Sequence, residues 1–167
     1  MNFEALIRNW HNKTIVPEDY FSNFVFEYLA FIAYLKKIRH FEGSDRDTIQ
    51  DLKMDRSIEN EYKDAIESNP ALSQTLHNLI DELREKPIRN VSSPEQLRRH
   101  WTGPSPGVIN SIHDWTNIVE FWYTVRNNLF HGLKDPENER DMQMAKYAYK
   151  TLSPLVGIFV SQISGRQ

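Results

Sequence analysis

The first strong pattern in the sequence is helical and lies between residues 17 and 40. Large apolar residues recur there at steps of three and four, which places them on one face of an α-helix. Pro17 suits the first turn, with Glu18 and Asp19 beside it at the positive end of the helix dipole, and Gly43 suits the end. The pattern predicts a helix whose buried face is formed by Phe21, Phe24, Tyr28, Phe31, Leu35 and Ile38.

Helical spacing recurs along the rest of the chain, and alternating β-branched runs are absent. We expect a polar helix over 45–68, ended by Asn-Pro, and another over 72–85. A further helix is expected from 111 or 114 to about 132. The last covers about 138–163, with a kink at Pro154. Helices with apolar stripes must bury them against one another, so the fold class predicted is all-α, a helical bundle of four to five main helices.

Residues 86–110 form the irregular part of the chain. Ser93-Pro94-Glu95 is the start of a possible short helical turn, because serine caps helices and proline fits a first turn. Loops of this length in a compact domain are often functional, although some only connect elements. The segment is predicted to be a loop because it is punctuated by Pro87, Pro94, Gly103, Pro104, Pro106 and Gly107.

Composition narrows the class of protein. The 167 residues, with nine Phe, four Trp and seven Tyr, suffice for a single domain over 1–167 with a core over about 17–163. The absence of cysteine excludes disulfides and thiolate metal sites, and it favours a cytoplasmic location. No apolar run approaches the roughly 20 residues that span a bilayer, so no membrane association is expected. The net charge of −3 disfavours a globally basic nucleic-acid binder but leaves room for a local basic patch.

One arginine interrupts the apolar stripe of the helix expected over 111–132. On an ideal wheel with Trp122 at zero, Arg126 falls at about +40°, inside the stripe. A guanidinium cannot lose its proton, so it needs a carboxylate, an interface or a cleft that admits an anion. Glu27, among the aromatics of the first helix, is one candidate partner, although it could equally face water.

Asn127 and His131 lie four residues apart on the same helix and share a face mostly away from the stripe. That face would normally be solvent, or it could be a second interface. Each residue also has a structural interpretation, since Arg126 could form an ion pair and His131 could cap the helix end. Together, however, an arginine, an amide and a histidine within six residues can bind a phosphate and move protons near neutral pH.

The segment Val-Arg-Asn-Asn-Leu-Phe-His-Gly-Leu-Lys around Arg126 and His131 resembles the Arg-x4-6-His signature of the HEPN superfamily (higher eukaryotes and prokaryotes nucleotide-binding). Its position, at the end of the penultimate long helix, is also similar to that family. The aromatic-rich first helix is a further likeness, and the resemblance covers residues 17–163. Many relatives have a second glycine after His-Gly, where this chain has Leu133, which leaves the subfamily open.

The resemblance implies a helical bundle that often dimerises, and in many members a metal-independent endoribonuclease of toxin–antitoxin or other defence systems. It implies catalytic roles for Arg126 and His131 and an orienting role for Asn127. Lys134 is implied as a substrate-binding residue, because relatives often have a lysine shortly after His-Gly. A nucleotidyltransferase-like antitoxin is the kind of protein partner implied.

A second group of residues could also contact RNA. Basic and aromatic side chains in and beside the loop could guide a phosphate backbone and stack a base, or they could form a solvated rim. No metal-ligand spacing, phosphate loop or dinucleotide turn is present, so neither a metal nor a cofactor is expected. Arg98 and Arg99 are the substrate-binding candidates in this group, which consists of Arg84, Lys86, Arg89, Arg98, Arg99, His100 and Trp101.

Two functions of different classes follow. The first is a metal-independent endoribonuclease, in which His131 transfers protons and Arg126 meets the charge on the phosphate. The second is a non-catalytic module that binds a nucleotide, RNA or a protein through the same cleft. Acid–base cleavage calls for two proton-transfer groups, whereas the motif has one histidine. We therefore expect a homodimer that shares its site across a two-fold axis.

Overall fold

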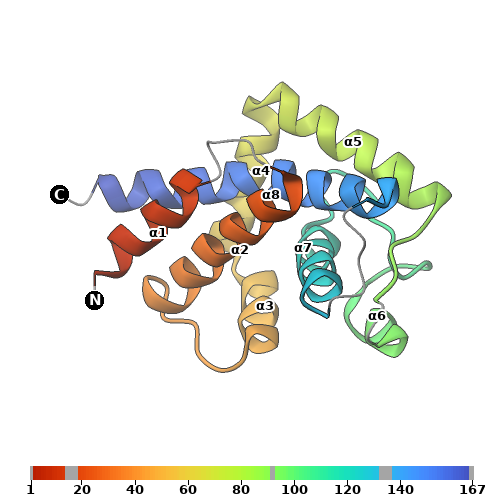
Figure 1. Cartoon of the computed structure of the whole chain (residues 1–167), viewed down its shortest axis with the longest axis horizontal. Coiled ribbons are helices and arrows are strands. Elements are labelled where there is room, and N and C mark those ends of the chain that lie inside the picture. The colour runs from red at the N-terminus through yellow and green to blue at the C-terminus, as the bar shows by residue number, and fades with distance from the viewer. Residues whose placement is uncertain (1, 14–18, 91–92, 132–136, 166–167) are drawn as a thin grey trace.

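The computed structural model describes residues 2–13, 19–90, 93–131 and 137–165, and helices are the only regular elements within these ranges (Figure 1). This confirms the all-α class, although the helices are more numerous than the four to five expected. None of the helices in these ranges is both long and apolar enough to cross a bilayer. The helices are α1 (Phe3–Lys13), α2 (Tyr20–Lys37), α3 (Asp45–Met54), α4 (Arg56–Ser68), α5 (Pro70–Glu85), α6 (Pro94–His100), α7 (Trp115–Phe130) and α8 (Glu139–Ser164).

The first predicted helix corresponds to α2, but it is shorter at both ends. Asp19 is its N-cap and accepts a hydrogen bond from the backbone N–H of Ser22 at 2.7 Å, whereas Pro17 lies outside the described residues. The helix ends at Lys37, three residues before the expected end at His40, and Gly43 does not terminate it. His40, with a φ of 58°, has already turned the chain away.

The polar helix expected over 45–68 is two helices, because Asp55 separates α3 from α4. Asp55 has extended backbone angles, and its carboxylate accepts a hydrogen bond from the N–H of Ile58 at 3.0 Å, so it starts α4 as an N-cap. The other carboxylate oxygen of Asp55 accepts a hydrogen bond from Arg39 at 2.5 Å. The sequence thus contained a residue that can cap a helix, but the prediction placed Asp55 inside one continuous helix.

The remaining predictions for helices are confirmed to within a few residues. The short turn expected at 93–95 is α6, and α5 begins at Pro70 rather than at Leu72. The helix α8 contains Pro154 and continues beyond it to Ser164. Local signals sufficed here because caps and helix-breaking residues act over one turn of the chain.

The helix α1 was not predicted, and it extends the core beyond the expected 17–163. Ile7 is fully buried, and α1 packs against α2 and the C-terminal part of α8, as Figure 1 shows. Phe3, Leu6, Ile7 and Trp10 recur at helical spacing, so the sequence carried a signal that the prediction missed.

The centre of the core is an aromatic cluster on α7. Trp122 is fully buried, and its ring meets those of Phe31, Tyr62 and Trp115 at centroid distances of 5.5–6.0 Å. Its indole N–H donates to Thr151 Oγ1 on α8 at 2.9 Å. These contacts join α2, α4, α7 and α8 and fix the position of α7.

A charged pair inside the bundle makes folding depend on pH. The carboxylate of Glu27 is fully buried and lies 3.0 Å from Nδ1 of His11. The hydrogen bond to Glu27 raises the pKa of His11 above its ordinary 6.5, against the opposing effect of burial. Glu27 is therefore neither the partner of Arg126 nor exposed to water, which corrects both alternatives.

We expect the free energy of unfolding to fall as the pH rises above neutral. A histidine whose pKa is raised in the folded protein stabilises it fully below the unfolded value of about 6.5, and that stabilisation disappears as the pH passes the folded value. Urea denaturation between about pH 6 and about pH 9 measures the slope. His11→Gln should flatten it, while the exposed His77→Gln should leave it unchanged; equal slopes in all three proteins would contradict the assignment.

Candidate functional site

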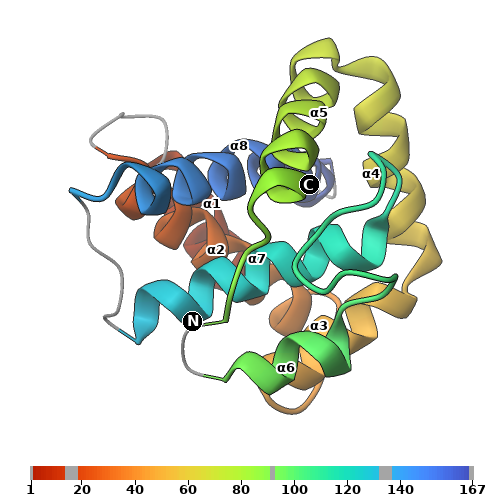
Figure 2. The same cartoon turned by 90° about the vertical axis from the view of Figure 1, so that its right-hand side faces the viewer.

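The helix α7 that carries the motif lies at the centre of the bundle (Figure 2). It contacts α2, α3 and α8, and the extended segment after α5 passes across it. Polar side chains are therefore buried on several of its faces. Asn127 is only 6% exposed and Asn128 only 3%, so the expectation that Asn127 faces solvent or a second interface was wrong within this chain.

Arg126 forms an ion pair with the carboxylate of Asp45, as expected for an arginine inside an apolar stripe. The Nη2 atom of Arg126 lies 3.1 Å from Oδ2 of Asp45, the first residue of α3. Lys36 binds the other oxygen of the same carboxylate at 2.7 Å. The side chains of Arg126 and Asp45 remain 27% and 29% exposed, so the pair lies at the surface and the guanidinium is accessible to a ligand.

Aromatic rings complete the surroundings of this guanidinium. Its Cζ lies 4.7 Å from the ring centroid of Phe130 and 6.0 Å from that of Tyr28. Burial raises the pKa of the Tyr28 hydroxyl well above its usual range, and the charge of Arg126 opposes that rise. Among the described residues, neither the hydroxyl of Tyr28 nor Nε of Arg126 has a hydrogen-bond partner. The Nε atom is therefore not among the atoms that hold the arginine in place.

Asn127 restrains the other edge of the arginine. Its Oδ1 accepts a hydrogen bond from Nη1 of Arg126 at 2.9 Å. Since Asn127 is buried and the guanidinium is not, the amide is the more rigid partner. The geometry therefore agrees with an orienting role for Asn127.

His131 is the C-cap of α7 and is exposed. Its backbone N–H donates to the carbonyl of Asn127 at 3.1 Å, which leaves the imidazole projecting from the tip of the helix. On a helix, positions five apart differ by about 140° around the axis and about 7.5 Å along it. On this ideal geometry the Cα positions of Arg126 and His131 lie on different faces of α7.

The ion cluster around Glu120 was missed by the sequence analysis. Glu120 is 1% exposed, and its Oε1 pairs with both Arg46 and Lys53 of α3. The guanidinium of Arg46 also lies 4.1 Å from the ring centroid of Tyr123. A signal was available, since Glu120 interrupts the apolar run Ile-Val-Glu-Phe-Trp, and a carboxylate in such a run needs a cationic partner.

The other predicted substrate-binding residues are not gathered around the motif. Arg98 and Arg99 are exposed on α6. The same helix is fastened to α3, because Lys53 donates to the carbonyl of His100 at 3.1 Å. Burial, with the nearby charge of Arg46, lowers the pKa of the His100 imidazole. Lys134 lies outside the described residues.

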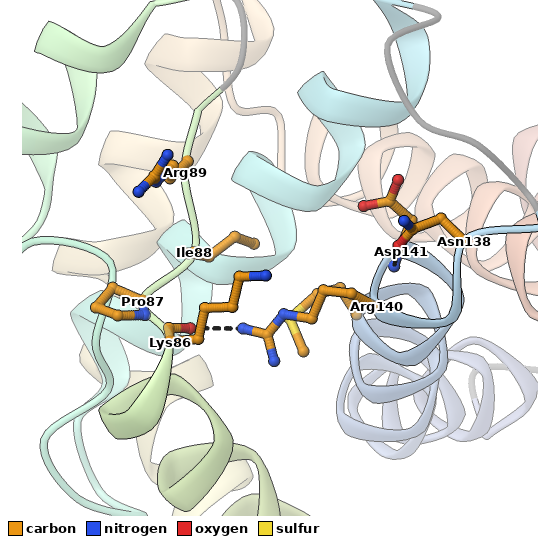
Figure 3. A pocket seen from close by; sticks show the side chains of 8 residues that line it. Lys86, Pro87, Ile88, Arg89, Asn138, Arg140 and Asp141 are labelled. Atoms are coloured by element: carbon orange, nitrogen blue, oxygen red, sulfur yellow. Dashed lines mark hydrogen bonds between the residues drawn. The ribbon is translucent and has the colours of Figure 1, made fainter.

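A cleft lies apart from the motif, on the other side of the extended segment after α5. It has a volume of 540 Å³ and lies between the extended segment 86–90 and the first turn of α8 (Figure 3). Neither Arg126 nor His131 lines it. A small apolar hollow continues from it toward α7, where Asn128 and Leu129 form the wall.

Asp45→Asn tests whether Arg126 is available to an anion. Removing the carboxylate should lower the free energy of unfolding by about 1 kcal/mol or less, because both partners are partly exposed. It also leaves the charge of Arg126 uncompensated, so inorganic phosphate should stabilise this variant more than the wild type. Urea denaturation with and without phosphate measures both effects. Asp81→Asn, in an exposed pair with Arg84, is the matched control; an equal gain from phosphate there would contradict the prediction.

Comparison with known proteins found no protein that is similar to this chain. No family model, no curated protein and no solved structure matches the chain.

Proposed function

We propose that this chain is a metal-independent endoribonuclease of the HEPN type, which uses Arg126 and His131. The observation that carries the proposal is the placement of these two residues at the end of α7. His131 is exposed at the tip, and Arg126 is partly exposed just before it, restrained by Asn127. The resemblance of the segment to the HEPN signature supports the same assignment.

The chemistry requires little beyond these groups. The ribose 2′-hydroxyl attacks the adjacent phosphorus when a base takes its proton, and an acid protonates the leaving 5′-oxygen. A histidine near neutral pH suits either transfer. The guanidinium offers two parallel N–H donors to the phosphorane oxygens as negative charge develops on them. The products are a 2′,3′-cyclic phosphate and a free 5′-hydroxyl.

The separation of Arg126 and His131 around α7 favours a site shared by two copies of the chain. Each chain has one motif histidine, whereas concerted cleavage uses an acid and a base on opposite sides of the phosphate. A two-fold axis beside the tip of α7 would bring both copies of each residue to one phosphate. Mixing Arg126→Ala chains with His131→Ala chains tests the shared site. The heterodimer should differ in activity from both mutant homodimers, and a strict monomer that cleaves RNA would refute it.

The experiment that tests the activity uses RNA in excess EDTA. The protein should cleave a single-stranded RNA there and leave 2′,3′-cyclic phosphate ends. An oligonucleotide with 2′-deoxyribose throughout should remain intact, because it lacks the nucleophile. Cleavage of the deoxy substrate, or full inhibition by EDTA, would rule out the proposed chemistry. The proposed biological setting is a cytoplasmic toxin–antitoxin or other defence system, with a nucleotidyltransferase-like antitoxin as partner.

A non-catalytic module that binds a nucleotide, RNA or a protein is the alternative, and one observation favours it. Arg126 forms an ion pair with Asp45, and His131 is the C-cap of α7, so both residues already have a structural role. In that case RNA would bind and remain uncut. Asp45→Asn would then strengthen binding of RNA without producing cleavage.

A further inference from the structure

The 540 Å³ cleft is built by a segment whose backbone is held by its neighbours. The N–H of Ile88 donates to the carbonyl of Gly107 at 3.0 Å. Asn128 on α7 donates to the carbonyl of Arg89 at 2.7 Å, and Arg140 on α8 donates to the carbonyl of Lys86 at 2.5 Å. Three separate parts of the chain thus fix the segment 86–90 through its main chain.

Gly107 allows this close approach. Its φ is 86°, and a Cβ on it would lie 2.4 Å from the carbonyl oxygen of Ile88. No other residue fits without moving the segment. The wall of the cleft is therefore preformed, which lowers the entropic cost of binding a ligand there.

The side chains of this wall, by contrast, are free for a ligand. Lys86 and Arg89 are exposed, and neither has an ion-pair partner among the residues that the structure describes. Figure 3 shows the amine of Lys86 reaching into the space before α8, and Arg89 at the upper end of the segment with its guanidinium on the side away from α8. Arg140 on the opposite wall is already paired with Glu82 at 2.8 Å, so Lys86 and Arg89 are the cations left for a ligand, and Asp141 is the single carboxylate among the lining residues.

The floor of the cleft is apolar. Ile88 and Met144 line it and are buried, and they continue into the hollow bounded by Val125 and Leu129. An apolar floor beside a cationic rim suits a ligand with an aromatic ring and an anionic group. The volume lies within the range of about 300–1,000 Å³ that small-molecule sites have. A nucleotide unit has both features, with its base over the floor and its phosphate at the rim.

The hollow beside the cleft is walled by α7, the helix that also carries the candidate catalytic residues. Asn128, beside the cleft, and Arg126 lie two positions apart on α7 and so about 200° apart around its axis. The tip with His131 lies between these two faces. A strand that enters the cleft and crosses the tip would therefore pass His131 and reach Arg126.

We propose that this cleft is a substrate-binding site that holds a nucleotide of a single-stranded RNA, with Lys86 and Arg89 on its phosphates. The proposal rests on the proposed ribonuclease function, because it assigns the cleft to the substrate of that reaction. Arg98 and Arg99 lie outside the residues that line this cleft, so a role for them would be separate.

The test is RNA binding by Lys86→Ala/Arg89→Ala, measured by fluorescence anisotropy with a labelled oligouridylate in a His131→Ala background that prevents cleavage. Both substitutions keep the backbone carbonyls that hold the segment. We expect binding to weaken about ten-fold or more. The slope of log K against log salt concentration should become less negative by about 1 to 1.5. Lys37→Ala/Lys150→Ala is the matched control, since it removes the same charge from exposed positions outside the cleft. It should weaken binding less than about two-fold.

The outcomes separate the two proposals. Equal binding by the cleft variant and the control variant would overturn the cleft as an RNA site, whether or not His131→Ala abolishes cleavage. If the cleft variant alone loses RNA binding while the wild type leaves RNA uncut, the ribonuclease proposal fails and the cleft remains an RNA-binding site. In an active enzyme, Lys86→Ala/Arg89→Ala should raise KM and keep kcat, which a loss of folding would not produce.

Discussion

Alanine at His131 is expected to lower the rate of RNA cleavage in EDTA by about 100- to 10,000-fold, the contribution of a positioned acid or base. The imidazole is exposed and only the backbone of His131 caps α7, so the folded structure should persist. Single-turnover rates with saturating RNA isolate the chemical step from binding. His77→Ala, at another exposed helical histidine, should cleave at the wild-type rate.

Substitutions of Arg126 and Asn127 complete this prediction. Arg126→Lys retains the charge but not the two-pronged guanidinium, so it should also be impaired. Asn127→Ala should lose less activity than His131→Ala, because the amide acts on the substrate only through Arg126. If Arg126→Ala and His131→Ala both cut RNA as fast as the wild type, the activity does not belong to this site.

Replacing Trp122 with alanine should reduce the free energy of unfolding by about 3–5 kcal/mol, the largest effect that we expect on stability. The side chain is fully buried among three aromatic rings, and its loss leaves a cavity at the junction of four helices. The hydroxyl of Thr151 also loses its donor, although it still donates to the carbonyl of Tyr147. A domain of this size has about 5–15 kcal/mol in total, so the variant should be near its unfolding threshold.

Urea denaturation followed by circular dichroism measures this loss. Trp122→Phe retains an aromatic ring, so it should cost clearly less than alanine. Met54→Ala is the control, because that side chain is 77% exposed and should change stability by less than about 0.5 kcal/mol. A Trp122→Ala variant as stable as Met54→Ala would show that the cluster is not the centre of the core.

The break at Asp55 shows where local reasoning fails. Aspartate is tolerated inside a helix and is also a good N-cap, so the sequence around it is compatible with one helix or two. Arg39, in the turn after α2, binds the Asp55 carboxylate and favours the break. Periodicity also did not say where α1 would pack, and its place in the core comes from its contacts with α2 and α8, where Ile7 is buried.

The sequence alone determined the all-α class, most of the helices and the fact that Arg126 needs an anionic partner. These properties depend on periodicity, capping and the cost of burying a charge, which act within one or two turns. The tertiary structure decided that the partner is Asp45 rather than Glu27, that Asn127 is buried, and that Lys86 and Arg89 border a cleft. Each of these depends on which elements pack against α7, and residues as far apart as Asp45 and Arg126 meet only when the whole bundle has assembled.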